Sequence, residues 1–236
     1  MQSYGGGVCQ VSTTLYNAVL KAELEVTQRS NHSMIVTYVK PSMDAAIAGD
    51  YKDLKFVNNL DAPIYIEGYT VGKDIYFNIY GQETRPSNRK VTYESEVVSE
   101  EDPGTQFVAT GDAVGSISTT QGKHMGYVAR LWKIVTVDGV EQSRDAINKS
   151  TYKSSPKIVN VGTASADPNA TAAVNAALAT GDEATIYATV AQYSGAGQTP
   201  SEAPAEAPAD SSAEAAAILG TVDESQITGN TTTEGQ

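Results

Sequence analysis

Several residue types that define common protein classes are scarce in this sequence. Its 236 residues include one cysteine, two histidines and one tryptophan, and no run of about 18 apolar residues is present. One cysteine cannot form an internal disulfide, and no spacing of cysteine, histidine and acid resembles a zinc motif. We therefore expect no membrane-spanning segment in this chain, no metal and no other cofactor.

Basic residues are absent from the last third of the chain. None of the 16 Lys and Arg follows Lys157, whereas ten of the 28 Asp and Glu do, so most of the net charge of −12 belongs to the C-terminal part. Nucleic acids and anionic membrane surfaces bind clustered cations, and this chain has no basic stripe. We expect neither as a partner.

The segment 164–236 is rich in Ala, Thr, Ser, Pro, Gly and acidic residues and contains few large apolar ones. Such a composition cannot bury enough apolar surface to offset the entropy lost on ordering. We therefore predict a disordered tail over residues 164–236, with transient helix at most at 169–193.

The first residues of the chain contain neither the basic region nor the apolar core of an export signal. The strands rich in Thr, Ser and Asn and the acidic tail are nevertheless typical of an exported bacterial wall protein. We expect an extracytoplasmic location, at the cell wall or surface of a Gram-positive bacterium.

Residues 1–81 show the pattern of an α+β domain. Apolar residues recur at helical spacing over residues 9–25, which predicts one main helix. Short β-rich runs follow and predict antiparallel strands at 34–39, 53–57, 63–69 and 74–80, the last two joined as a hairpin. The order is helix first and sheet after.

Residues 82–90 are polar and rich in turn formers, which is typical of a linker. The next unit, 91–163, predicts an elongated all-β module. Its expected strands are 90–98, 106–110, 127–137, 140–147 and 157–161. Asp138-Gly139 is a strong signal for a two-residue hairpin between the third and fourth of them.

Cys9 is the first candidate for chemistry. Three glycines precede it and the predicted helix starts beside it, so its sulfur lies at a helix N-terminus, where unpaired amides and the helix dipole favour the thiolate. Ser12 and Thr13 follow in the first turn, where hydroxyls cap free amides or line a pocket. The alternative is that Cys9 is a small, buried, inert residue.

His32 is the candidate proton acceptor for this thiol. It lies just before the strand predicted at 34–39, where the chain returns toward the helix, so a Cys–His pair can form. An exposed loop histidine is the alternative. His124, the second histidine, falls in a polar loop of the other unit, where we expect it to be exposed.

The string GGGVCQVSTTLYNA at residues 5–18 resembles the signature of the VanW-like family of bacterial envelope proteins. The likeness continues over residues 2–81 and includes Arg29, His32-Ser33, Asp44-Ala45-Ala46 and Pro63-Ile64-Tyr65-Ile66. Residues 91–163 contain recurring glycines and end in IVNVGT. They are similar to the G5 domain, an elongated β module. Family members carry several dozen further residues before the glycine turn, so the resemblance implies an N-terminally truncated domain and a membrane-anchored parent.

The VanW-like resemblance implies an L,D-transpeptidase, an acyltransferase that cross-links peptidoglycan stem peptides through a cysteine thioester. Cys9 would be the nucleophile and His32 the base. Asp44 or Asp53 would orient His32, and the sequence does not choose between them.

The same resemblance implies a set of substrate-binding positions. These are Gly7, Gln10, Ser12, Thr13, Arg29 and Ser33. The amides of Cys9 and Gln10 would stabilise the oxyanion, and Arg29 would bind a stem carboxylate.

The expected partners are peptidoglycan stem peptides and glycan strands, with the G5-like module docking the enzyme to glycan. The alternative is a non-catalytic glycan-binding surface protein in which Cys9 and His32 are structural. A third interpretation is an adhesin or stalk built on the β module and the tail. A link to vancomycin resistance does not follow from the sequence.

Overall fold

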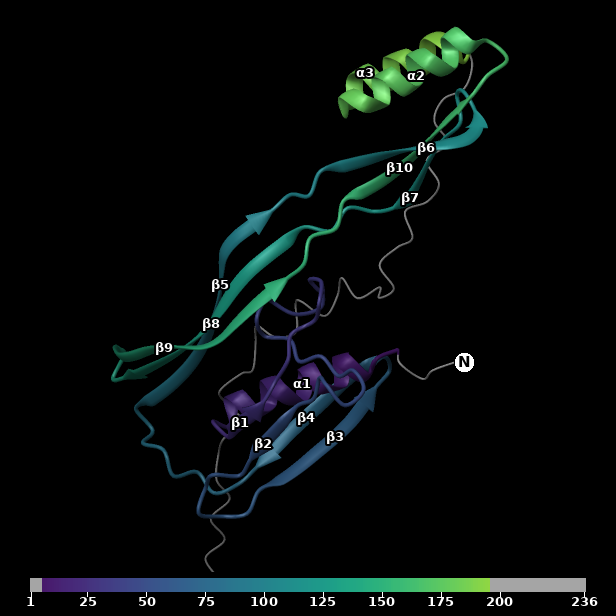
Figure 1. Cartoon of the computed structure of the whole chain (residues 1–236). Helices are drawn as coiled ribbons and strands as arrows, with labels where there is room; N and C mark the ends of the chain where they lie inside the picture. Colours follow the sequence, from purple (N-terminus) through teal and green to yellow (C-terminus); the bar gives the residue numbers. More distant parts are fainter. Residues whose placement is uncertain (1–5, 196–236) are drawn as a thin grey trace, which may run out of the picture.

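A computed structural model describes residues 6–195 of the chain. In chain order its elements are α1 (Val8–Lys21), β1 (Glu25–Gln28), β2 (Lys55–Val57), β3 (Tyr65–Val71), β4 (Asp74–Tyr80), β5 (Arg89–Glu101), β6 (Thr105–Ala113), β7 (Ile117–Gln121), β8 (Gly126–Val137), β9 (Val140–Tyr152), β10 (Lys157–Ala164), α2 (Pro168–Thr180) and α3 (Glu183–Tyr193). Figure 1 shows α1 lying against the short strands β1 to β4, with a long β module extending away from them.

Helix α1 begins at the glycine turn and ends in a Schellman motif. Gly7, its N-cap, has a φ of 94°, a left-handed conformation that glycine adopts without steric cost. At the other end Glu23 has a φ of 55°, its N–H donates to the carbonyl of Leu20, and the N–H of Leu24 donates to Val19. The predicted helix is confirmed, but it ends at Lys21 because this motif turns the chain into β1.

The N-terminal strands form two antiparallel pairs, β1 with β2 and β3 with β4. The β module consists of strands β5 to β10. It contains the sheet β5-β8-β9, which is antiparallel, and the sheet β6-β10-β7, in which β6 and β10 run parallel. The prediction of one helix followed by mostly antiparallel strands is therefore confirmed.

A tight turn and a close backbone contact shape the β module. Asp138 and Gly139 have φ values of 51° and 78° and join β8 to β9, as the hairpin signal predicts. In β10, a Cβ on Gly162 would lie 2.2 Å from the carbonyl oxygen of Ala113, so only glycine permits this close approach to the end of β6.

The strand predicted at 34–39 is wrong, and β1 and β7 were not predicted. Residues 34–39 are rich in β-branched residues, but they form no strand, and β2 pairs with β1. They instead pass beside His32, whose ring packs edge-on against Tyr38. The unpredicted strand β7, with sequence ISTTQ, is short and polar and pairs only with β10.

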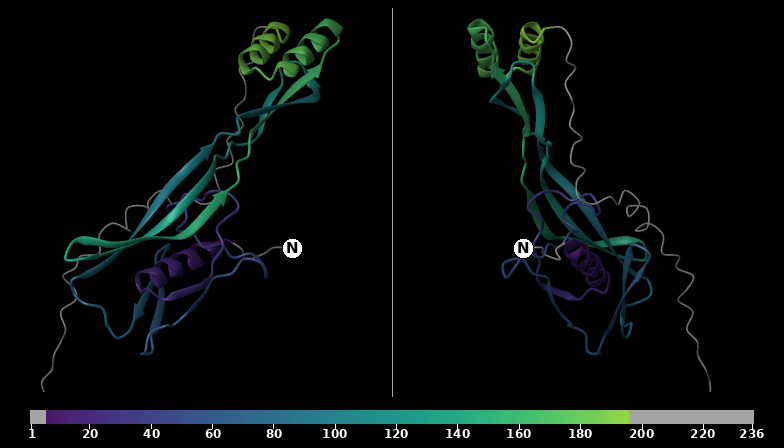
Figure 2. Two further views of the ribbon diagram at one scale, coloured as in Figure 1. Left: turned by 60° about the vertical axis from the view of Figure 1, so that its left-hand side comes forward. Right: turned by 90° about the vertical axis from the view of Figure 1, so that its right-hand side faces the viewer.

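The predicted disorder is wrong for the part of the tail that the structure describes, because α2 and α3 pack against the end of the β module (Figure 2). Asp167 and Asp182 cap the two helices by accepting N–H groups of Asn169 and Thr185. Apolar residues of α2 and α3 are buried in one cluster with two valines of β10. Its members are Val159, Val161, Val174, Ala177, Ile186 and Val190. Residues 196–236 of the predicted tail lie outside the described residues.

The N-terminal part and the β module share a core. Tyr16 and Leu20 of α1 are buried with Ala45 and with Leu131 of β8. The Tyr93 hydroxyl of β5 donates to the Leu20 carbonyl at 2.5 Å. The segment predicted as a linker therefore joins two parts that are packed together.

Glu23, held by the Schellman motif, binds three cations that follow it in the sequence. Its carboxylate lies 2.5 Å from Arg89, 2.6 Å from Lys133 and 3.3 Å from Arg85. The hydrogen bond from Arg89 is the largest contribution to a pKa of about 2 for Glu23, and the two other cations add to it against the opposing effect of burial. The ion cluster thus fastens the end of α1 to the β module.

We expect Glu23→Gln to lower the free energy of unfolding by about 1–2 kcal/mol near neutral pH, because it removes charge-assisted hydrogen bonds. The pKa of Glu23 is lower in the folded than in the unfolded chain, so its contribution is present above about pH 4.5 and is lost as the pH falls toward about 2. Denaturant unfolding of both proteins at neutral and acid pH measures this.

The difference between wild type and Glu23→Gln should shrink at acid pH. Glu25→Gln is the matched control, because Glu25 is an exposed neighbour that forms no ion pair within residues 6–195. A difference that is the same at both pH values would contradict the role of the Glu23 carboxylate.

Candidate active site

Cys9 lies in the first turn of α1 and is half-buried. The first hydrogen bond of the helix runs from Val11 N–H to the Gly7 carbonyl, so the amides of Cys9 and Gln10 precede the helical ladder. The Cys9 sulfur accepts the Ile47 N–H at 3.5 Å and lies 3.6 Å from the Ile47 carbonyl oxygen. Gly7, next to it, is exposed, and a Cβ there would meet nothing within 4 Å.

The hydroxyls of Ser12 and Thr13 face inward rather than toward a substrate. Ser12 Oγ donates to the Ala45 carbonyl at 2.5 Å, and Thr13 Oγ1 accepts the Ala45 N–H at 3.0 Å. Both side chains are buried. Their predicted substrate contacts do not fit this placement; they fasten α1 to the backbone that precedes Ile47.

His32 is oriented by Asp44. The backbone N–H and the ring Nδ1 of His32 both lie 2.7 Å from Asp44 Oδ2. An ionised carboxylate only accepts, so Nδ1 carries the proton and Nε2 is left as the acceptor in the neutral ring. The Tyr38 hydroxyl lies 3.4 Å from Nε2. Of the two orienting residues that the sequence left open, Asp44 has this position, whereas Asp53 is exposed and pairs with Lys55.

Asp44 is fully buried and is held by donors from both parts of the chain. Arg29 Nη2 lies 2.7 Å from Oδ1, and the Tyr152 hydroxyl of β9 donates to the same oxygen at 2.5 Å. Burial would raise the pKa of Asp44, but hydrogen bonds from His32 and Tyr152 and the charge of Arg29 outweigh it and hold this pKa below its ordinary value. The carboxylate is therefore charged at neutral pH.

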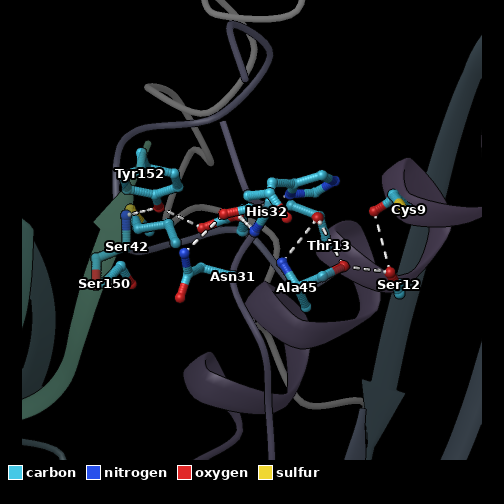
Figure 3. A network of polar contacts seen from close by, with 12 residues as sticks. Cys9, Ser12, Thr13, Asn31, His32, Ser42, Ala45, Ser150 and Tyr152 are labelled. Atoms are coloured by element: carbon cyan, nitrogen blue, oxygen red, sulfur yellow. Dashed lines mark hydrogen bonds and ion pairs between the residues drawn. The ribbon is translucent and has the colours of Figure 1, made fainter. Parts of the chain in front are cut away.

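Strand β9 places the polar side chains of Asn148, Ser150 and Tyr152 on one face at this point, and Figure 3 shows the last two. Ser150 Oγ accepts from Arg29 Nη1 at 2.8 Å and lies 2.8 Å from Ser42 Oγ, and the Tyr152 hydroxyl accepts the Ser42 N–H. Asn148 donates to the Tyr16 hydroxyl. Sequence reasoning missed these residues; the alternation Asn148, Ser150, Tyr152 was the available signal, because every second residue of a strand shares one face.

The placement of Arg29 differs from its predicted role. Its side chain is only 7% exposed and donates to the Asp44 side chain, to the Asp44 carbonyl and to Ser150. Its charge is balanced by Asp44, so the structure gives it a positioning role in place of the expected binding of a stem carboxylate. Ser33, by contrast, is exposed.

The segment 44–47 links the two candidate catalytic residues. Asp44 contacts His32 at one end, and Ile47 contacts the Cys9 sulfur at the other. Three residues of extended chain span at most about 10 Å. Within residues 6–195 no hydrogen bond joins Cys9 to His32, which is common for catalytic pairs without substrate.

A cleft opens beside His32, at the junction of the two parts. Its volume is about 340 Å³, and it is lined by residues 29–33, Lys52, Thr151 and Lys153. Its lining combines the N-terminal part with the residues around the end of β9.

No group of three or more His, Cys, Asp or Glu side chains in residues 6–195 is arranged to hold a metal ion. None of the helices in that range has the length and hydropathy needed to cross a bilayer.

Comparison with known proteins relates each part to a family. Residues 1–80 match the family described as VanW like protein, and residues 83–164 match the G5 domain. The uncharacterized protein YoaR of Bacillus subtilis (strain 168) is 38% identical over 82 residues, which are 35% of this chain and 27% of YoaR. The chain thus spans only about a quarter of the length of this relative.

Two solved structures resemble the β module. The IgA1 protease G5 domain is 26% identical, covers 33% of this chain and 94% of its own, and has a TM-score of 0.24. HP0197-G5 is 20% identical, covers 31% and 99%, and has a TM-score of 0.17.

This chain carries a VanW-like domain at residues 1–80, followed by a G5 domain at residues 83–164. These domains are typical of extracytoplasmic bacterial cell-wall proteins. Together they indicate a cell-wall-associated protein.

We expect Tyr152→Phe to lower the free energy of unfolding by about 1–3 kcal/mol, because it leaves the buried Ser42 N–H without a partner and removes one of the two donors to Asp44 Oδ1, the other being Arg29. Chemical denaturation measures the change. Tyr65→Phe is the control, since the Tyr65 side chain is 65% exposed and its change should stay within about 0.5 kcal/mol. Equal effects of the two substitutions would contradict the role of the Tyr152 hydroxyl.

Proposed function

We propose that this protein is a cysteine acyltransferase of the L,D-transpeptidase type that acts on peptidoglycan stem peptides. The observation that supports it best is a thiol at a helix N-terminus together with a histidine whose Nδ1–H donates to a buried carboxylate, both contacted by the segment 44–47. In this arrangement Nδ1 carries the ring proton, and Nε2, which lies 3.4 Å from the Tyr38 hydroxyl, is the nitrogen that takes a further proton. A Cys–His–Asp order of nucleophile, base and orienting group suits acyl transfer.

In the first step the thiolate of Cys9 attacks the carbonyl carbon of the L-centre of a diaminopimelate residue in the donor stem. His32 takes the thiol proton at Nε2. The negative charge that develops on the carbonyl oxygen is stabilised by the amides of Cys9 and Gln10, which precede the helical ladder at the positive end of α1. The peptide C–N bond then breaks, and His32 returns the proton to the leaving amine.

In the second step the side-chain amine of another stem attacks the thioester. His32 accepts a proton from this amine, the C–S bond breaks, and the Cys9 thiol is restored as the new amide forms. The half-buried position of Cys9 lets an extended peptide approach over the exposed Gly7, where no side chain intervenes.

The G5 domain is proposed to hold the enzyme on the glycan strands of the wall. Its sheet β5-β8-β9 also supports Asp44 through Tyr152, so anchoring and catalysis would share one rigid junction. Tethering raises the effective concentration of stem peptides at the site without any new contact to them.

A non-catalytic wall-binding protein is the second candidate. It is favoured by the internal contacts of the Cys9 sulfur with Ile47, which a structural cysteine would also make. It does not account for a buried charge network that orients a histidine beside an open cleft.

Incubation with a purified stem tetrapeptide should add one acyl-tripeptide to the protein at Cys9, and intact mass spectrometry detects it. The experiment uses the protein at its natural length. Cys9→Ala should form no adduct, and His32→Gln should form it about 10²–10⁴ times more slowly, the usual contribution of a general base. Lys149→Gln is the control with an expected normal rate within about threefold, because Lys149 is an exposed residue of β9 outside the cleft.

An adduct that persists in Cys9→Ala would contradict the proposal. So would a wild-type protein that forms none, and that result would favour the wall-binding candidate.

A further inference from the structure

The cleft beside His32 carries positive charge and no carboxylate among its lining residues. Arg29 is neutralised by Asp44, but Lys52 and Lys153 both line the cleft, and neither has an ion pair with an acidic side chain in the part of the chain that the structure describes. Two uncompensated ammonium groups at one concave surface attract an anion.

Lys52 is held close to His32. Its Nζ donates to the carbonyl of Asn31 at 2.8 Å and lies 3.3 Å from Ser33 Oγ, so it contacts the residues on both sides of the histidine. Lys153 comes from the other domain, directly after β9, and its backbone N–H donates to the Ser33 carbonyl at 2.7 Å. The two domains thus each contribute one cation to the same cleft.

The proposed acyl transfer releases a D-amino acid next to His32. This histidine must reach the leaving nitrogen in order to protonate it, and in an α-amino acid the carboxylate is only two bonds from that nitrogen. The carboxylate of the leaving residue therefore has to lie within a few ångströms of the His32 ring, on the side where the cleft opens.

We propose that the cleft between the VanW-like and G5 domains binds the C-terminal carboxylate of the donor stem peptide, through Lys52 and Lys153. This inference rests on the proposed function and assigns a part of its substrate to a part of the protein. A volume of about 340 Å³ suits the end of a peptide rather than a whole stem.

The Cys9 sulfur forms a bond to the carbonyl carbon, the bond from that carbon to the leaving nitrogen breaks, and the thiol proton passes through His32 to the nitrogen. The products are the thioester and a free D-amino acid whose carboxylate stays paired with Lys52 and Lys153 until it leaves.

The test compares the tetrapeptide with its C-terminal carboxamide, which lacks the negative charge. Binding is measured by calorimetry on the Cys9→Ala protein, where no reaction follows. We expect the acid to bind about tenfold more tightly than the amide, as a partly exposed charge-assisted hydrogen bond provides. In Cys9→Ala/Lys153→Gln this preference should largely disappear.

Lys149→Gln is the matched control, since Lys149 is an exposed lysine of β9 that does not line the cleft. It should keep the preference for the acid. Equal affinity for acid and amide, no binding of either peptide, or a preference that survives Lys153→Gln would each overturn the proposal.

The two proposals fail separately. If the wild type forms no thioester but the Lys153-dependent preference is present, the cleft is a carboxylate site and the transferase function falls. If thioester forms equally fast from acid and amide, the transferase function stands and the cleft assignment is wrong.

Discussion

This structure depends on the ion pair and hydrogen bonds of the buried Asp44 carboxylate. A charge removed from water is tolerated only when it is paired and fully hydrogen-bonded, and Asp44 has an ion pair with Arg29, two N–H donors from His32 and the Tyr152 hydroxyl. Removing one partner of such a group costs more than the bond itself. The network therefore fixes the loop between β1 and β2, which has little regular structure of its own.

This dependence makes the G5 domain part of the candidate site. Tyr152 lies at the end of β9, far along the sequence from His32, yet both contact the same carboxylate. The shared core around Leu131 and the ion cluster of Glu23 hold the sheet in that position. The module proposed to bind glycan is thus packed directly against the proposed catalytic residues.

Local patterns predicted much of this fold, and long-range contacts explain what they missed. The helix after the glycine turn and the Asp138-Gly139 hairpin depend on neighbouring residues, so the sequence alone identifies them. The same reasoning placed Cys9 and His32 as candidates but could not choose Asp44, because that choice depends on a strand over one hundred residues away. The helices α2 and α3 were predicted only as transient helix in a disordered tail, because composition averages over the few apolar residues that pack together.

The most direct test of this account is the protonation of the His32 ring, measured by ¹⁵N NMR on ring-labelled protein. The account predicts that neutral His32 carries its proton on Nδ1, with Nε2 unprotonated and available as a base. A neutral ring protonated on Nε2 would contradict it, since Asp44 would then not orient His32 and the nitrogen assigned to catalysis could not accept a proton.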